Sequence, residues 1–392
     1  MREVSSAAGT TGRVSGAQRA TVAACGIGFA AGWNLSNITA IASHIASSYG
    51  IALATVGFFT TALFAAHAGV QVPGGMLIDK LGAKRMGLLG LAIIAGTNAV
   101  AAIAPHTWLA LLMRALMGLG TGISFVGGSD YIRKSGAGGV AQGFYGGIGL
   151  AGGGIAVKVV AATDGWLAWR APFLSSLVVA GVAFALLATG PKEGVRVLPP
   201  RAAGASGGGK PVRVYRLMVL HIATFGLSVL VSNWLVELLR HHGYSKSTAA
   251  WVGLLVLVVG VISRPLGGWT ATKPWTRWAL AGSLVAGGLG CLCLVLAGPI
   301  AVAVLGALLV GFAAGIPFAT IFVSAARARP HAPARSVGLV NGSGSLVILA
   351  GAPLVGLTFD WTGEGRIGFA VIGILWTAAL LALPSRRELG LE

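Results

Sequence analysis

Two arginines stand inside long apolar stretches of the sequence, and their side chains are the ones best suited to bind a charged solute. Arg114 lies in the stretch 108–130 and Arg264 in the stretch 248–270. An arginine inside a membrane span costs about 2.5 kcal/mol or more by insertion scales, so its side chain should face a cavity or a partner. Its planar fork of N–H donors matches carboxylate, nitrate and phosphate groups. We therefore expect both arginines to bind an anion. The alternatives are that Arg114 donates to backbone carbonyls at a helix break and that Arg264 snorkels to the interface.

Polar side chains elsewhere in the apolar stretches recur at helical spacing. Asn34 and Asn37 are separated by three residues, and His67 and Gln71 by four, so each pair shares one face of a helix. Amides donate to and accept from solutes, and an imidazole exchanges protons near neutral pH. We expect all four side chains to contribute to solute binding, with His67 as a possible proton relay. Hydrogen bonding between helices is the structural alternative for the asparagines, and packing for His67.

A third pair at helical spacing, Asn233 and Glu237, lies in the apolar stretch 215–238. We include Asn233 among the expected solute-binding residues. Glu237 is the one acid there that would be able to carry a proton, but it lies near the end of the stretch, where we expect an ion pair with Arg240.

The composition is that of a membrane protein. Of the 392 residues, 55% are hydrophobic and 10% charged, and the mean hydropathy is +0.84. The formal net charge of +18 comes from bases spread between apolar runs, so a nucleic-acid partner is not expected. Three cysteines also lie in apolar segments, where thiols behave as small hydrophobic groups: Cys25, Cys291 and Cys293. We expect no disulfide, no metal, no other cofactor and no enzymatic activity, and a Walker-type Gly-Lys-Ser/Thr segment for ATP is absent.

Runs of about 20 apolar residues cross a bilayer as helices, and polar residues separate twelve such runs here. These are 20–43, 53–74, 86–104, 108–130, 139–162, 167–189, 215–238, 248–270, 277–297, 300–324, 337–358 and 367–384. Lys and Arg gather in alternate connections and in both terminal segments. Because cytoplasmic loops carry the excess of these bases, both termini and the middle connection are predicted to be cytoplasmic.

A polar stretch in the middle of the chain, with "PPRAAGASGGGKP" at its centre, is typical of a linker. We predict an N-terminal cytoplasmic tail at 1–19, a six-helix bundle at 20–190, a cytoplasmic linker at 191–214, a second six-helix bundle at 215–385 and a C-terminal tail at 386–392.

The two predicted bundles share a repeat. A shift of 193 residues places "PGGMLIDKLGAKR" on "LGGWTATKPWTRW" and "GLGTGISF" on "GFAAGIPF", and "GFYGGIG" matches "GLVNGSG" after two further residues. Matches in three regions at nearly one offset favour two homologous halves.

The stretch "QVPGGMLIDKLGAKRM" places one acid and three bases directly after an apolar run. It fits the loop signature G-x-L-x-D-R/K-x-G-x-R/K-R/K. The later stretch "RALMGLGTG" fits a second pattern, an arginine followed by spaced glycines. With these motifs, the chain resembles the major facilitator superfamily across nearly its whole length. The signature positions are Gly75, Leu77, Asp79, Lys80, Gly82, Lys84 and Arg85.

The resemblance implies a transporter that rocks two bundles about a central cavity lined mainly by the first, fourth, seventh and tenth helices. It also implies a conformational latch made of the signature residues. Asp79 would accept hydrogen bonds at the start of the eleventh helix, near Ser336, and pair with Arg133. The alternative is a loop that only sets orientation, for which the bases suffice.

A narrower resemblance concerns the nitrate/nitrite porter branch. "SRPLGG" and the glycine run "GGIGLAGGG" are similar to motifs of that branch, in which an arginine in each of two helices grips the anion. Arg264 stands at the second of these positions, but Gln71 stands at the first and Leu150 where the branch commonly has asparagine. Half of the expected anion clamp is therefore missing.

The sequence thus predicts an all-α membrane protein with twelve transmembrane helices in two pseudo-symmetric six-helix bundles. We expect a monomeric secondary transporter in the lipid bilayer of the cytoplasmic (inner) membrane, moving a small organic or inorganic anion with protons or in exchange. A proton-coupled multidrug or metabolite exporter is the main alternative, although the fifth apolar run lacks the Gly-Pro motif typical of drug/proton antiporters. A membrane receptor that does not transport is a further alternative.

Overall fold

The computed structural model describes residues 8–193, 212–361 and 365–389, and the regular elements in these ranges are all helices. The chain divides into two compact units, residues 1–203 and 204–392. This division falls inside the predicted linker 191–214, most of which lies outside the described residues. The exact bounds of the predicted bundles stay a prediction.

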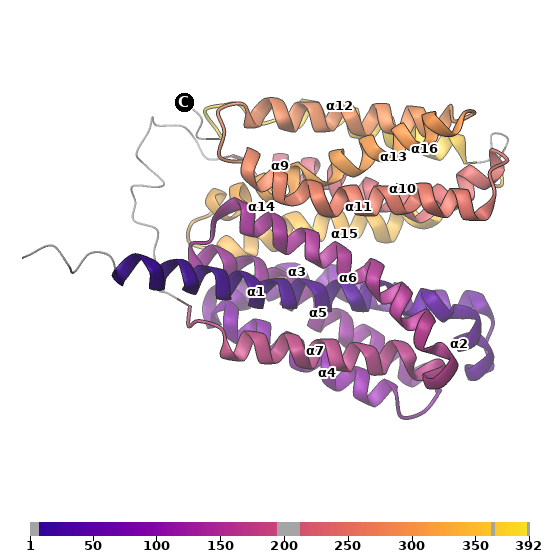
Figure 1. Ribbon diagram of the computed structural model, residues 1–392, viewed down its shortest axis with the longest axis horizontal. Coiled ribbons are helices and arrows are strands. Elements are labelled where there is room, and N and C mark those ends of the chain that lie inside the picture. Colours follow the sequence, from indigo (N-terminus) through magenta and orange to yellow (C-terminus); the bar gives the residue numbers. More distant parts are fainter. Residues whose placement is uncertain (1–7, 194–211, 362–364, 390–392) are drawn as a thin grey trace, which may run out of the picture. The chain divides into compact units, whose positions relative to one another are not determined.

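The first unit is built from long helices, with short ones at their connections (Figure 1). In chain order they are α1 (Ala8–Ser36), η1 (Ile38–Ile41), α2 (Ala42–Tyr49), α3 (Leu53–Leu81), α4 (Ala83–Ala101), α5 (Thr107–Ser135), α6 (Gly138–Leu167), η2 (Ala168–Arg170) and α7 (Ala171–Thr189). Helix α5 packs against α3, α4 and α1, and α1 packs against α6 and α7.

In the second unit, three of the predicted spans are each formed by more than one helical element. The elements are α9 (Val214–His221), the π-helical turn η3 (Ile222–Leu227), α10 (Ser228–His241), α11 (Lys246–Thr270), α12 (Thr276–Val295), α13 (Ile300–Gly315), α14 (Pro317–Ala328), α15 (Pro333–Leu357), α16 (Arg366–Ala378) and η4 (Ala379–Ala382). The break between α13 and α14 comes at Ile316, directly before Pro317, whose ring is tolerated at the start of a helix but not in its interior.

Each of the twelve predicted spans falls on one or more of these helical elements. By length and hydropathy, eight stretches of the described chain are able to cross a membrane, and one of them, Gly138–Thr189, contains both α6 and α7. The final segment, Arg366–Ala382, is apolar but shorter. A multi-pass, all-α membrane fold is therefore confirmed, whereas the count of twelve crossings stays a prediction. Helix α1 begins at Ala8, so residues 8–19 of the predicted tail are helical.

Two glycines of α5 allow its backbone to approach that of α3. A Cβ at Gly118 would overlap the carbonyl oxygen of Leu63, and one at Gly122 would lie 2.8 Å from the carbonyl oxygen of His67. Real Cβ atoms do not approach a carbonyl oxygen so closely, so only glycine permits this crossing. As a consequence, side chains of α5 beside these glycines lie directly against α3.

The same crossing recurs in the second unit at the offset of 193 residues. A Cβ at Gly311 would lie 3.0 Å from the carbonyl oxygen of Val256, and one at Gly315 would overlap Ser263. Gly311 and Val256 are the residues that the offset pairs with Gly118 and Leu63. The predicted repeat is therefore confirmed in the packing of α11 against α13, which matches that of α3 against α5.

The crossing leads to a stability prediction. We expect Gly118→Ala to lower the free energy of unfolding by about 1–3 kcal/mol, because the added methyl group forces two backbones apart. The matched control is Gly69→Ala in α3, where a Cβ would meet no atom within 4 Å. That variant should stay within about 0.5 kcal/mol of the wild type. The measurement is the melting temperature in detergent by intrinsic tryptophan fluorescence, and equal melting temperatures for the two variants would contradict the prediction.

Candidate functional site

Arg114 is fully buried in the first unit, and its hydrogen-bond partners among the described residues are uncharged. Its Nε donates to the carbonyl oxygen of Phe59 at 3.2 Å, and its Nη1 lies 3.3 Å from Asn37 Oδ1 and 3.3 Å from Met117 Sδ. Its Nη2 has no hydrogen-bond partner among the described residues. A bond to a backbone carbonyl, the alternative to anion binding, is therefore present, although α3 is continuous at Phe59 and α5 at Arg114. It uses only part of the guanidinium, and Nη2 stays available.

Asn34 of α1 and Asn37, which directly follows α1, differ in their contacts. Asn37 donates to Ser176 Oγ at 2.8 Å and to the carbonyl oxygen of Pro172 at 3.0 Å, so that its own oxygen is held toward Arg114. Asn34 instead accepts a hydrogen bond of 2.9 Å from Asn98 of α4. Asn37 thus orients the arginine, whereas Asn34 joins two helices.

His67, Gln71 and Thr121 form a second buried polar group in the same unit. His67 Nδ1 lies 3.0 Å from Thr121 Oγ1, and His67 Nε2 lies 2.8 Å from Gln71 Nε2. The close crossing of α3 and α5 makes this contact possible, because Thr121 directly precedes Gly122. The spacing of four residues between His67 and Gln71 brings them into contact, as predicted.

Arg264 lies in a group of aromatic side chains in the second unit. It is 5% exposed, and its guanidinium carbon stands 4.6 Å from the ring centroid of Phe318, a cation–π geometry. Phe318 stacks on Phe322 at 4.4 Å, and His221 packs against both rings. The His221 Nε2 lies 3.3 Å from Asn341 Oδ1. The charged head of Arg264 is therefore held in the unit interior rather than among exposed groups.

The remaining candidate of the second unit lies elsewhere. Asn233 is exposed on α10, and the structure does not bring it to Arg264. Glu237 accepts from Arg240 at 3.4 Å, which confirms the predicted ion pair, and it also contacts His241.

The loop signature lies at the junction of α3 and α4, where its glycine has a structural role. Gly82 adopts a φ of 96°, and a Cβ there would lie 3.2 Å from a carboxylate oxygen of Glu193. That carboxylate accepts from the backbone N–H of Lys84, in the first turn of α4, where the helix dipole favours an anion. The Lys84 ammonium donates to the carbonyl oxygens of Ala188 and Gly190 at 3.0 and 2.7 Å. The signature thus binds the end of α7 and the start of the linker.

The base expected to pair with Asp79 has another partner. Arg133 Nε lies 2.7 Å from Asp130, an acid one turn earlier in α5, and Lys134 bridges Asp130 and Glu193 at 3.2 and 2.8 Å. Asp79 is half-buried and makes contacts of its own, while Lys80 and Arg85 are exposed and Gly75 is buried. The latch stays a prediction, since the two units are described separately.

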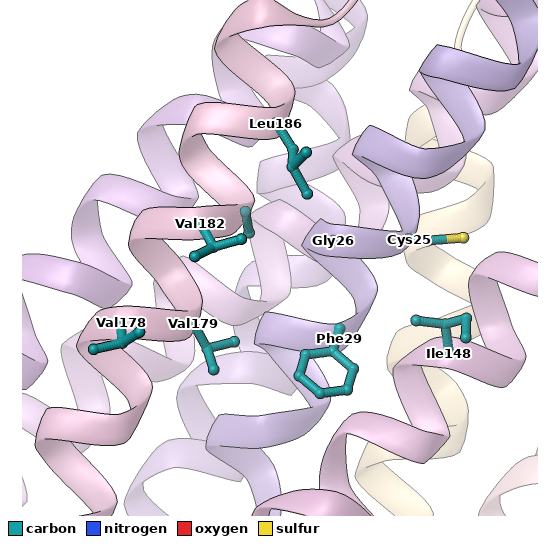
Figure 2. Close-up of a pocket in the computed structure, with 9 residues that line it drawn as sticks. Cys25, Gly26, Phe29, Ile148, Val178, Val179, Val182 and Leu186 are labelled. Carbon is teal, nitrogen blue, oxygen red and sulfur yellow. The ribbon is translucent and has the colours of Figure 1, made fainter.

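An apolar groove also lies in the first unit, but apart from the polar groups. It has a volume of about 330 Å³, and its walls include Cys25 and Phe29 of α1, Ile148 of α6, and Val178 and Val182 of α7 (Figure 2). None of the candidate residues lines it. It is typical of a surface that meets lipid chains and supplies no group for a polar solute.

Sequence comparison bears on these observations. Residues 22–352 and 216–389 match the sequence model of the Major Facilitator Superfamily. The chain belongs to this superfamily. Among curated proteins, no sequence matches it. As a superfamily member, the protein is a multi-pass membrane transporter.

Solved structures of superfamily transporters share the fold over nearly the whole chain. The proton:xylose symporter XylE is similar with a TM-score of 0.76 and 14% identity, covering 96% of this chain and 99% of XylE. The human organic anion transporter MFSD10 is similar with a TM-score of 0.72 and 15% identity, covering 94% of this chain and 99% of MFSD10. The E. coli transporter FucP is similar with a TM-score of 0.71 and 15% identity, covering 93% of this chain and 97% of FucP. At these identities the likeness shows the fold alone.

Several polar residues of the two groups escaped the sequence analysis. Asn98 and Thr121 contact the candidates Asn34 and His67, and each stands in an apolar run. His221 and Asn341 contact each other, and His221 packs against Phe318, the ring on which Arg264 lies. Polarity inside a span was the signal that would have found them. No such signal pointed to Glu193, because a single acid at the edge of a linker is indistinguishable from a solvated one.

Glu193 offers a test of the loop contacts. Burial raises the pKa of Glu193, but the hydrogen bonds from Lys134 and from the backbone of Lys84 outweigh burial and hold that pKa below its ordinary value. A lowered pKa in the folded state means that the contribution to stability is full above the ordinary glutamate pKa of about 4.3 and is lost as the pH falls through the lowered value. We therefore expect Glu193→Gln to melt below the wild type at pH 7 and the difference to shrink below about pH 4.

The control is Glu237→Gln, which removes an exposed carboxylate whose ion pair should contribute little. A difference between Glu193→Gln and the wild type that is constant from pH 7 to pH 3 would contradict the prediction.

Proposed function

We propose that this protein is a secondary active transporter of a small anion, organic or inorganic, that works by alternating access in the cytoplasmic membrane. The observation that carries the proposal is the state of Arg114. Its cationic head is fully buried, and its partners among the described residues are a carbonyl, an amide and a thioether. Neither the charge nor the Nη2 donor is balanced by these groups, so an anion is the ligand that would complete the site.

The distribution of acids in the first unit supports this choice. Asp79, Asp130 and Asp164 stand in or near the terminal turns of their helices, and Glu193 follows α7. Among the described residues of this unit, no acid therefore stands beside the cation of Arg114. A buried arginine of this kind favours carboxylate, nitrate or phosphate, because its planar fork binds two oxygens at once.

Arg264 supplies a second cation of the same type, in the other unit. Its position is equivalent to that of Gln71 under the offset of 193 residues, so one unit carries an arginine and the other an amide at corresponding places. An amide contributes fewer donors than an arginine and no charge. This asymmetry suits a solute with a single small anionic group.

The names of the similar structures widen the range of solutes to be tested. XylE is named for xylose, FucP is described as a fucose:proton symporter and MFSD10 as an organic anion transporter. Our choice of an anion rests on Arg114 rather than on these names. We further propose protons as the coupling ion, a monomeric state and cytoplasmic termini, the last because Lys and Arg gather in the connections on that side.

The proposal is tested by ligand-dependent melting of the purified full-length protein. The probes are nitrate, inorganic phosphate, acetate and succinate, with xylose as neutral solute and tetraphenylphosphonium as lipophilic cation. A native-state ligand at about 100 times its Kd stabilises the folded protein by about 2.7 kcal/mol. We expect one or more of the anions to raise the melting temperature, and Arg114→Gln and Arg264→Gln to abolish that rise.

Arg240→Gln is the matched control, because Arg240 is exposed and pairs with Glu237 on α10. It should keep the full response to the anion. Stabilisation by tetraphenylphosphonium alone would contradict the anion proposal and favour an exporter of lipophilic solutes. Stabilisation by an anion without flux in reconstituted vesicles would instead indicate a receptor.

A further inference from the structure

The hydrogen-bonded chain of Thr121, His67 and Gln71 has a chemistry that anion binding at Arg114 does not use. All three side chains are buried, with exposures of 0%, 4% and 0%. Both ring nitrogens of His67 have a polar neighbour within 3.0 Å. An imidazole held in this way has a defined tautomer, which can be worked out from its neighbours.

Thr121 determines where the proton of the neutral imidazole lies. The Thr121 hydroxyl donates to the carbonyl oxygen of Gly118 at 3.0 Å, so its oxygen is left to accept from His67. His67 therefore carries its proton on Nδ1. Its Nε2 is the basic nitrogen, and it accepts the N–H of the Gln71 amide at 2.8 Å.

The Gln71 amide is only half used in this arrangement. Its nitrogen donates to His67, while its Oε1 is buried and has no hydrogen-bond partner among the described residues. A buried acceptor without a partner is unfavourable, because it has lost its hydrogen bonds to water. The present orientation of the Gln71 amide therefore depends on the neutral His67, and protonation of His67 at Nε2 would reverse it.

We propose that His67 binds the coupling proton at Nε2 and that Gln71 converts this protonation into a hydrogen-bond donor for the anion. The inference rests on the proposed function as an anion transporter. When the proton arrives, one N–H bond forms at Nε2 and the imidazole gains one positive charge, with no bond broken in the protein. Nε2 then donates, and only Oε1 of Gln71 is able to accept from it. A half turn of the amide brings Oε1 to His67 and turns its NH2 group outward.

This turn changes what the free end of Gln71 offers to a solute. With His67 neutral, the free end is an acceptor, which repels an anion; with His67 protonated, it is a donor, which binds one. The position is also the one at which the second unit carries Arg264. The first unit would therefore hold a donor controlled by a proton where the second unit holds a permanent one.

The side chains around His67 do not balance the positive charge of a protonated imidazole, so a bound anion would have to balance it. Helix α3 packs against α5, α4, α2 and α1, and the aromatic rings of Phe64 and Phe125 flank His67 at 6.4 and 6.5 Å. The nearest charged residue along α5 is Arg114, seven residues before Thr121 and thus roughly 10 Å along the helix. The other charged or titratable residues of these helices are Arg13, Arg19 and Cys25 of α1, His44 and Tyr49 of α2, Asp79 and Lys80 of α3, Lys84 and Arg85 of α4, and Asp130, Tyr131, Arg133 and Lys134 of α5.

No acid of these helices therefore stands beside His67 in the described part of the first unit. A buried imidazolium is costly unless an opposite charge accompanies it. An anion bound nearby supplies that charge, so each of the two ligands should raise the affinity for the other by the same factor.

The test compares proton and anion movement in one preparation. Full-length wild type, His67→Gln and His106→Gln are reconstituted in liposomes containing a pH-sensitive dye, and gradients of nitrate, inorganic phosphate or succinate are applied. The exposed His106 provides the matched control. We expect about one proton to accompany each anion, beyond the movement in protein-free vesicles, in the wild type and in His106→Gln. In His67→Gln this ratio should fall at least tenfold.

The outcomes separate this inference from the proposed function. Anion movement by the wild type without protons, or an unchanged ratio in His67→Gln, would overturn the role of His67 and leave anion transport intact. Failure of every anion probe to bind or move would overturn both.

A second measurement serves if His67→Gln does not fold. Calorimetry of wild type with the transported probe, in two buffers of different ionisation enthalpy at pH 7, should show uptake of about one proton per anion bound. Gln71→Met keeps His67 but has no amide to turn, and it should reduce that uptake at least tenfold. Proton uptake that is absent in the wild type, or unchanged in Gln71→Met, overturns the inference.

Discussion

The close crossing of α5 over α3 is the constraint on which the polar interior of the first unit depends. It exists because Gly118 and Gly122 have no side chains, so that backbone meets backbone. At that separation a threonine between the glycines reaches His67, and an arginine one turn before them reaches the carbonyl of Phe59. Any side chain at either glycine would separate the helices and draw these polar groups out of reach. The second unit repeats the crossing with Gly311 and Gly315.

The interior that results is polar without being acidic. Within the described first unit, Arg114 and His67 meet amides, hydroxyls and carbonyls, and the carboxylates stay near the helix ends. In a low-dielectric interior such an arrangement has one unbalanced cation and one group able to become a second. An anion is the simplest ligand that balances the first, and a proton taken up with it would turn Gln71 toward the solute. The proposed solute choice and the proposed proton coupling thus share one basis, which is that no acid of the described first unit stands beside Arg114 or His67.

At the helix ends that face the predicted cytoplasm, acids and bases pair with each other, unlike the cation of the interior. Glu193 binds the first turn of α4 and Lys134, while Lys134 also contacts Asp130. These contacts connect the α3–α4 junction, the end of α5 and the segment after α7. The signature glycine at Gly82 fits this cluster because its φ is positive and a Cβ there would be in tight contact with the carboxylate of Glu193. The loop is therefore a structural joint of the first unit as well as a topological signal.

The sequence by itself determined the membrane class, the helical spans, the repeat and the superfamily, because hydrophobic length, glycine spacing and charge placement act locally along the chain. It also identified the two buried arginines and the contact of His67 with Gln71, since helical spacing fixes which side chains of one helix meet. Tertiary structure alone decided the partners that lie on other helices. Asn34 joins Asn98 whereas Asn37 orients Arg114, Arg133 pairs with Asp130, and Glu193 closes the loop. Such pairings depend on how helices cross, and a crossing is set by the summed packing of two surfaces rather than by any residue read on its own.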